Sequence, residues 1–368
     1  MLSQAFNQIL VDLQINLSLT SYNGVFKEFA HEHHQELLTM SAASLLRSSL
    51  VWDNHGCLPL RPLDETFLPQ LELYRTSGVD VAMINIGFGD HGIEQHIRML
   101  AQFRRWIATH NENYLLIECV EDIDDARRTG RLAIGFDIEG ANAIDDQISL
   151  IALYYDLGVR WMLMAYNRNN RVGGGSQDDD QGLTAFGRET LDEMARVGML
   201  ACCTHTGYRT ARDVLDYSAN PVIFSHSNPR AQHDHPRNVP DDLITMCAAK
   251  GGVICLNGIG IFLGNNDNST ETYFRHMDHV VQLVGADHVG LGLDYVFDME
   301  ELNSYITKMK GNFPPGLGYE LGGGIRCVSP AQIEPLIELQ LKAGYTEDEI
   351  RNILGKNMLR IAHKVWRQ

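Results

Sequence analysis

Short apolar segments alternate with amphipathic segments along most of this 368-residue chain. This alternation is the feature that most constrains the fold, because mostly apolar strands separated by helices form a parallel sheet that is covered on both faces. Eight such units in about 320 residues predict a (β/α)8 barrel of the TIM type. The predicted strands are Leu46–Asp53, Val79–Ile86, Leu132–Ile138, Val159–Ala165, Met199–Thr204, Pro221–Ser225, Gly252–Leu256 and His288–Leu293.

The segments that flank the barrel are predicted to be helical. Residues 1–45 form an N-terminal helical extension packed on the barrel, and residues 46–368 form the barrel itself with C-terminal helices. One further apolar segment, Tyr114–Cys119, is an accessory strand or a loop. A doubly wound open sheet is the alternative fold, but no glycine-rich dinucleotide-binding sequence follows a predicted strand.

Charge and cysteine content restrict the partners and the compartment. The formal net charge of −17 argues against nucleic acid or an anionic membrane as a partner. The sequence has no run of 18 apolar residues, and its seven cysteines show no CxxC spacing. The N-terminus lacks a basic region and a small-residue cleavage site, so we expect no signal peptide. We therefore expect a cytoplasmic protein that acts on a small molecule.

Ionisable and polar side chains follow most of the predicted strands. The carboxyl ends of all strands meet at one mouth of a TIM barrel, where the chemistry of this fold takes place. Taken singly, each residue could be a loop residue, a helix cap or an ion-pair partner. Together, they would be costly to bury without a cation, so we predict a two-metal site with a bridging hydroxide. The residues are His55, Cys57, Glu139, Tyr166, His205, His226 and Asp294.

The stretch VWDNHGCLPL, residues 51–60, carries the least usual pair of this set. Alternate residues of a strand point to the same side, so His55 and Cys57 can reach a common point. Imidazole and thiolate are both zinc ligands. The alternative is that Cys57 is a small buried residue beside a chance histidine.

Several of these motifs together resemble the membrane dipeptidase (renal dipeptidase) family of amidohydrolase-like metallo-hydrolases. The resemblance covers roughly residues 45–366, and it is closest to a bacterial branch in which the first motif has a cysteine where the family has an aspartate. The matching motifs are WDNHGC, DIEG, THT, FSHSN, HPRNVPDDLI, HVGLGLD and the tail YTEDEIRNILGKNMLRI.

The resemblance implies a role for each matching position. His55 and Cys57 would bind the first metal ion, Glu139 would bridge two ions, and His205 and His226 would bind the second. A thiolate at position 57 favours zinc, with one or two ions per chain and two expected.

Three further residues are assigned through the same resemblance. Arg237 would pair with the terminal carboxylate of the substrate, which suits its forked guanidinium. Asp294 would carry a proton from the attacking water to the leaving amine. Tyr166 stands where the family's first-described members have a histidine that polarises the substrate, and its phenol can donate a hydrogen bond to the scissile carbonyl.

The sequence thus predicts a zinc-dependent, dipeptidase-like hydrolase that cleaves the amide bond of a dipeptide, with a homodimer as a candidate assembly. The family resemblance implies that the leaving side tolerates a D-residue. An alternative is a hydrolase of another small amide, an N-acyl amino acid, a lactone or a carbamate on the same metal core. An alternative from another class is a non-catalytic barrel that binds a carboxylate.

Overall fold

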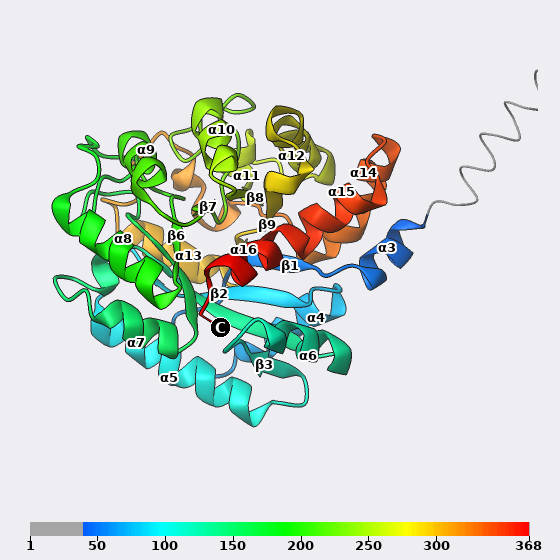
Figure 1. Cartoon of the computed structure of the whole chain (residues 1–368), viewed down its shortest axis with the longest axis horizontal. Helices are drawn as coiled ribbons and strands as arrows, with labels where there is room; N and C mark the ends of the chain where they lie inside the picture. Colours follow the sequence, from blue (N-terminus) through cyan, green and yellow to red (C-terminus); the bar gives the residue numbers. More distant parts are fainter. Residues whose placement is uncertain (1–39, 368) are drawn as a thin grey trace, which may run out of the picture. The chain divides into compact units, whose positions relative to one another are not determined.

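The computed structural model describes residues 40–367, in which a closed parallel β-barrel is surrounded by helices (Figure 1). Eight strands follow one another around the barrel, and the pairing of β1 with β9, which places Asp53 opposite Leu291, closes it. The predicted TIM-type barrel is therefore confirmed. The barrel strands are β1 (Trp52–Cys57), β2 (Val81–Phe88), β4 (Leu132–Glu139), β5 (Val159–Leu163), β6 (Leu200–Cys202), β7 (Ile223–Phe224), β8 (Val253–Asn257) and β9 (Val289–Gly292).

Helices on the outside of the barrel bury one apolar face against the strands (Figure 1). Those that alternate with the strands are α4 (Glu72–Thr76), α5 (Ile93–Thr109), α6 (Glu121–Thr129), α7 (Leu150–Asp156), α8 (Ala185–Val197), α9 (Tyr208–Tyr217), α10 (Asp241–Ala249), α11 (Gly260–Leu263) and α12 (Thr270–Val284). The remaining helices are α3 (Ala42–Ser48), α13 (Met299–Lys308), α14 (Ile333–Lys342), α15 (Glu347–Arg351) and α16 (Asn357–Val365). Short helical turns are η1 (Leu68–Leu71), η2 (Ala141–Ala143), η3 (Ala286–His288), η4 (Tyr319–Gly324), η5 (Pro330–Gln332) and η6 (Asn352–Lys356).

The prediction for the first strand is wrong in its position. Leu46–Asp53 was predicted as a strand, but helix α3 continues to Ser48 and strand β1 begins only at Trp52. The apolar side chains Leu45 and Leu46 are buried on α3, which packs against α14. The helix and the strand thus lie next to each other within one apolar run. The predicted extension, residues 1–45, lies almost entirely outside the described residues.

Two short strands extend the barrel sheet. Strand β3 (Tyr114–Leu116) pairs in parallel with β4, so the segment Tyr114–Cys119 contains the predicted accessory strand. Strand β10 (Tyr295–Val296) pairs with the end of β1, where Gly56 lies opposite Tyr295. A Cβ atom at position 56 would lie 2.3 Å from Oη of Tyr74, so glycine is required for this close approach.

The chain between β10 and α14 covers one side of the barrel mouth. It contains α13 and η4, which contact each other, and the capping box of Ser329 with Gln332 ends it. A second capping box, Thr346 with Glu349, opens α15 as the sequence predicts. No helix within residues 40–367 has the length and apolar content needed to cross a membrane.

Candidate metal centre

Four of the predicted ligands meet at the carboxyl ends of their strands. Oε1 of Glu139 lies 3.2 Å from Nε2 of His205, 3.2 Å from Nε2 of His226 and 3.6 Å from Nε2 of His55. The two Nε2 atoms of His205 and His226 are 3.1 Å apart. All four side chains are buried. The structure thus brings together residues from β1, β4 and the turns after β6 and β7.

Hydrogen bonds on the far side of the imidazole rings fix the tautomers of two histidines. Nδ1 of His55 lies 3.2 Å from Oδ2 of Asp137, and Nδ1 of His205 lies 2.7 Å from Oδ1 of Asn167. Both partners are acceptors, so each Nδ1 carries the proton and each Nε2 presents a lone pair. The Asn167 amide is itself oriented by its donation to the Asn312 carbonyl.

The centre therefore consists of acceptors that face one another. Oε1 of Glu139 has no hydrogen-bond donor among the described residues, although it lies close to three imidazole nitrogens. Buried lone pairs that converge in this way repel one another unless a proton or a cation lies between them, and one metal ion can satisfy several of them at once. The side chains present fit a metal ion, and their nitrogen and oxygen donors are those of zinc and related metals.

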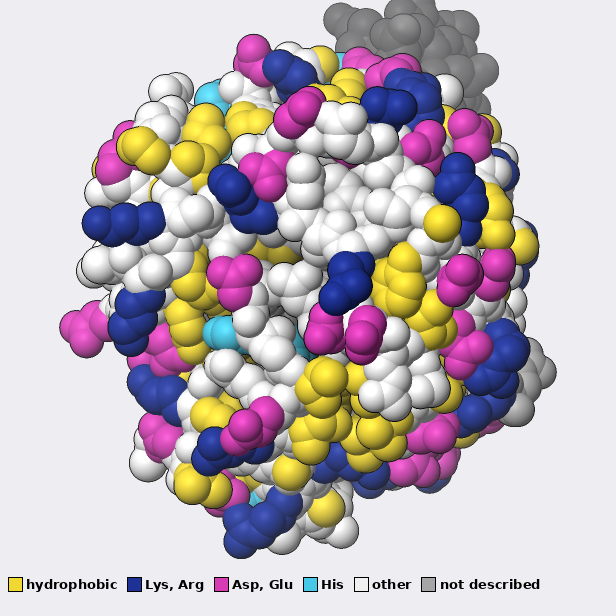
Figure 2. Space-filling model, turned by 90° about the vertical axis from the view of Figure 1, so that its left-hand side faces the viewer, with side chains coloured by type: hydrophobic (Ala, Val, Ile, Leu, Met, Phe, Trp, Pro, Cys, Tyr) yellow, Lys and Arg dark blue, Asp and Glu magenta, His cyan; other side chains and the backbone are white. Residues whose placement is uncertain are grey.

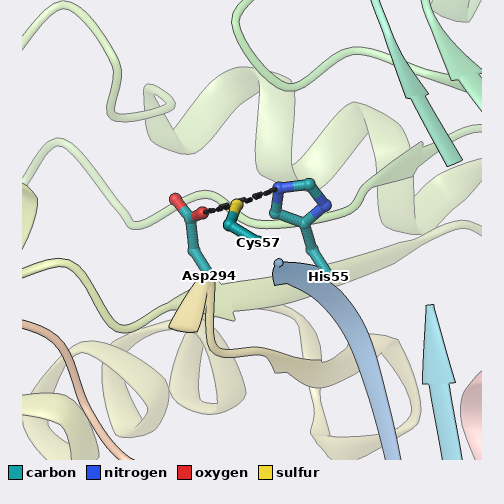
Figure 3. Close-up of side chains that lie close together, drawn as sticks. All are labelled: His55, Cys57 and Asp294. Atoms are coloured by element: carbon teal, nitrogen blue, oxygen red, sulfur yellow. Dashed lines mark hydrogen bonds and ion pairs between the residues drawn. The ribbon is translucent and has the colours of Figure 1, made fainter. Parts of the chain in front are cut away.

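Cys57 lies on the side of the centre next to Asp294 (Figure 3). Its Sγ lies 3.4 Å from Nε2 of His55 and donates to Oδ1 of Asp294 at 3.2 Å. His55, Cys57 and Asp294 form one group whose ligand atoms all lie within 4.8 Å of one another, and His55, Glu139 and His226 form a second. The two groups share His55. Asp294, predicted as a proton carrier, is thus also near enough to contact a metal ion.

Burial and mutual repulsion shift the pKa values in the centre. Burial, helped by Asp294 and Asp137, raises the pKa of Glu139 from 4.5 to about 8. Burial also lowers the pKa values of His205 and His226 well below 6.5 and raises that of the Cys57 thiol well above 9.0. In the absence of a cation, burial therefore favours the neutral forms of these four side chains. A metal ion would reverse this preference for Glu139 and Cys57.

The pKa of His55 is shifted in the opposite direction. Burial lowers it, but the neighbouring Asp137, Cys57 and Glu139 raise it well above 6.5. A proton thus takes the place of a cation at this imidazole when the site holds no metal. Metal binding would have to displace that proton, so its affinity depends on pH.

Three residues at the mouth have left-handed backbone conformations. These are Asn167 after β5, with φ of 55°, His205 after β6, with φ of 63°, and Asp294 after β9, with φ of 54°. Non-glycine residues rarely adopt this conformation, which costs on the order of 1 kcal/mol or more. Here it turns the chain sharply near the strand end, so that His205 and Asp294 enter the centre and Asn167 reaches Nδ1 of His205.

Asp294 is held by both neighbouring strands. Oδ1 of Asp53 accepts a hydrogen bond of 2.8 Å from the Leu293 amide, and the Asp294 amide donates to the His55 carbonyl at 3.0 Å. Nδ2 of Asn257 donates to Oδ2 of Asp294 at 2.9 Å. One carboxylate oxygen is therefore fixed by an amide, while the other faces Cys57 and His55.

Arg237 is buried in the loop after β7 without an anionic partner. Its Nε, Nη1 and Nη2 have no hydrogen-bond acceptor among the described residues, and its guanidinium lies 5.0 Å from the ring centre of Phe262. Its positive charge opposes the rise in the pKa of Glu139 and contributes to the lowered pKa of His205, so it acts electrostatically on the metal centre. An unpaired buried positive charge is unfavourable, and a bound anion would compensate it.

Tyr166 lies directly over one of the candidate ligands. Its ring stacks on that of His205, with centroids 4.1 Å apart and an interplanar angle of 23°. Burial raises the pKa of its phenol well above 10.0, so the hydroxyl keeps its proton and can donate it. Tyr166 also lines the cavity above the centre, together with Cys57, Glu139, His205 and Asp294.

That cavity opens at the barrel mouth and has an empty volume of about 810 Å³, including its open side. Figure 2 shows histidine side chains in gaps near the middle of one face, with hydrophobic side chains beside them.

Sequence reasoning missed the residues that orient the ligands. Asp137 lies two positions before Glu139 in the same strand, so the alternation that singled out His55 and Cys57 could have identified it. Asn167 and Asn257 gave no such signal, because their partners are 38 and 37 residues away.

Comparison with known proteins identifies the family. Residues 72–308 match the membrane dipeptidase family, peptidase family M19. The chain belongs to this family. The predicted resemblance is thereby confirmed, whereas the cysteine at position 57 and the individual site residues are not tested by the match.

Relatives and a solved structure agree with this membership. An uncharacterised dipeptidase of Schizosaccharomyces pombe is 30% identical over 71% of this chain and 60% of its own length. Dipeptidase 3 of Rattus norvegicus is 26% identical over 89% of this chain and 67% of its own length. An amidohydrolase from Pseudomonas aeruginosa, 26% identical, superposes with a TM-score of 0.79 over 89% of this chain and 99% of that one.

Proposed function

We propose that this protein is a metal-dependent hydrolase that cleaves a small amide whose leaving amine carries a free carboxylate, as in a dipeptide or an N-acyl amino acid. The observation that carries the proposal is the buried, unpaired guanidinium of Arg237, whose charge acts on Glu139 among the converging acceptors. A substrate carboxylate would pair with the guanidinium, and a metal ion would bind the converging acceptors. Membership in a dipeptidase family supports the same reaction.

Zinc is the metal we propose, with two ions favoured. His55, Cys57 and Glu139 would hold one ion, and Glu139, His205 and His226 the other. The mixture of imidazole, carboxylate and thiol donors supports zinc over magnesium or calcium, which prefer oxygen ligands. When bound, the metal supplies a Lewis acid for the scissile carbonyl and the hydroxide nucleophile near neutral pH.

The side chains around the metal centre then have distinct tasks. Arg237 binds the carboxylate of the leaving amino acid through its guanidinium fork. Tyr166 donates a hydrogen bond to the carbonyl oxygen as negative charge develops there. Asp294 accepts the proton of the attacking water on Oδ1 and delivers it to the leaving nitrogen, while Asn257 holds its Oδ2.

Two finer parts of the proposal concern the leaving group and the compartment. The family resemblance implies that a D-residue is tolerated on the leaving side, so both stereoisomers belong in any substrate series. A cytoplasmic location is supported by the seven cysteines, all of which are free thiols.

The test combines a variant of Arg237 with a change in the substrate. Arg237→Lys keeps the charge but loses the fork, so kcat/KM should fall by more than about tenfold, or about 1.4 kcal/mol. Amidation of the substrate carboxylate should lower the kcat/KM of the wild type by a similar factor. The same amidation should lower the kcat/KM of Arg237→Lys only a little further. Arg230→Lys, in the same loop but paired with Asp234 at the surface, is the matched control and should retain activity.

Three results would contradict the proposal. If the losses in kcat/KM caused by Arg237→Lys and by substrate amidation are additive, Arg237 does not bind the carboxylate. If the protein purified with metal supplied retains none, the metal centre is wrong. If metal is retained but no amide, lactone or carbamate is cleaved, the barrel is a binding protein.

A further inference from the structure

The cavity above the metal centre has one strongly apolar side, built by the last residue of β2 and by segments that follow β1 and β9. We call it the apolar wall. Each of its residues lines the cavity: Leu58, Leu60, Phe88, Val296, Leu302 and Ile306.

Helix α13 presents part of the apolar wall without burying it. Leu302 and Ile306 lie one turn apart, so they share a face of the helix. Both are only half-buried, and α13 has no fully buried residue. Aliphatic side chains that border an open cavity leave apolar surface in water, and a bound apolar group would remove it.

The acidic side chains on this side of the cavity already have ion-pair or hydrogen-bond partners. Nη1 of Arg61 lies 3.1 Å from Oδ2 of Asp298 and 3.2 Å from Oε2 of Glu301. Oε1 of Glu301 accepts from the Leu60 amide at 2.8 Å, and Oδ1 of Asp298 caps the start of α13. An ammonium group could therefore reach either carboxylate only in competition with Arg61.

The other acidic side chains that line the cavity, Glu139 and Asp294, belong to the metal centre. The free amine of a dipeptide bound against the apolar wall would therefore lose its water and gain at most a carboxylate that Arg61 already holds. Burying an unpaired charge in this way is unfavourable. An uncharged acyl group avoids that cost.

We infer that the acyl side of the substrate is uncharged and apolar, so that N-acyl amino acids with an aliphatic acyl group are preferred over dipeptides with a free amine. This inference rests on the proposed function and specifies its substrate class. The aliphatic chain lies against the apolar wall, and Leu302 and Ile306 set its preferred length.

A matched pair of substrates tests the charge. Leucyl-alanine and isocaproyl-alanine differ only in the amine, and each is made with either stereoisomer of alanine. The metal-loaded protein should cleave isocaproyl-alanine with a kcat/KM at least about tenfold higher. Equal rates, or a preference for leucyl-alanine, would overturn the inference.

A chain-length series tests the apolar contact. Affinity for acetyl-, butanoyl-, hexanoyl- and octanoyl-alanine, measured by calorimetry, should rise up to about fourfold per methylene that is buried. Leu302→Ala and Ile306→Ala should each lower the ratio of octanoyl to acetyl binding by roughly three- to tenfold. Thr307→Ala, on the exposed face of the same helix, is the matched control and should leave the ratio unchanged.

The binding measurement separates this inference from the proposed function. If length-dependent binding occurs and depends on Leu302 but no substrate is cleaved, the apolar wall is correct and the hydrolase proposal fails. If amides are cleaved without regard to acyl length or amine, the hydrolase proposal stands and the inference fails. If no member of the series binds, the inference is wrong.

Discussion

Asp137 offers a sharp test of how the metal centre is organised, because it touches only the outer side of a candidate ligand. Its Oδ2 accepts from Nδ1 of His55, and its Oδ1 accepts from Nδ2 of Asn85 at 3.0 Å. The carboxylate thus receives two donors at once. In Asp137→Asn, one of the two acceptors becomes an NH2 donor.

Either orientation of the new amide creates a conflict. If its oxygen faces Asn85, its NH2 faces His55, which must then move its proton to Nε2 and lose the lone pair that points at the metal centre. If its oxygen faces His55, two NH2 groups oppose each other at the position of a 3.0 Å hydrogen bond. We expect metal affinity to fall by about 10- to 100-fold, or about 1.4–2.7 kcal/mol, the scale of outer ligand-orienting residues.

A second substitution should repair the damage. In Asn85→Asp combined with Asp137→Asn, the new amide donates to the carboxylate introduced at position 85, and its oxygen returns to His55. That carboxylate can still accept from the Gly87 amide, as Asn85 does at 3.0 Å. We therefore expect the double variant to recover at least half of the lost binding free energy.

The assay is a competitive zinc titration against a chromogenic chelator at fixed pH, with thermal unfolding of the metal-free proteins as the control for folding. Wild-type affinity in Asp137→Asn would refute the tautomer argument. The argument would also be refuted if the double variant bound zinc no more tightly than Asp137→Asn. This conclusion requires that the metal-free forms of the two variants unfold at the same temperature.

Three more predictions address the other roles. Asp294→Asn should fold normally, because asparagine tolerates the left-handed backbone of this position, with φ of 54°. The variant should retain its metal, and its kcat should be lower by roughly 100-fold or more. With cobalt in place of zinc, the wild-type protein should show a sulfur-to-metal charge-transfer band in the near ultraviolet. The band should be absent from both Cys57→Ser and Cys57→Asp, and Cys57→Asp should still retain its metal. In the metal-free protein, the pKa of Glu139 is raised from 4.5 to about 8, so the folded state holds a proton that the unfolded chain releases. The contribution of Glu139 to the free energy of unfolding of the wild type therefore falls as the pH rises from 4.5 to about 8. Over the same range, the melting temperature of Glu139→Gln should increase relative to that of the wild type.

Each of these predictions has a result that contradicts it. Loss of metal in Asp294→Asn would make Asp294 a ligand. A cobalt protein without the thiolate band would leave Cys57 as a packing residue. A difference in melting temperature between Glu139→Gln and wild type that does not change with pH would mean that Glu139 is ionised in the metal-free fold.

The barrel and the location of its centre could be predicted from the sequence, and the reason is local. Apolar runs such as Leu132–Ile138 mark buried parallel strands, and the parallel arrangement brings their carboxyl ends to one mouth. Once His205 and His226 are placed just after successive strands, the topology brings them together. The first strand was misplaced because a short apolar run at Leu45 and Leu46 can belong to a helix as well as to a strand.

The partners within the mouth could not be predicted in this way. Cys57 contacts Asp294 across 237 positions, and His55 contacts Asp137 across 82. No local pattern shows that Arg237 has no anion or that Leu302 borders a cavity. These features depend on which side chains remain unpaired after folding, and because that is a property of the packed barrel mouth, only the tertiary structure decides it.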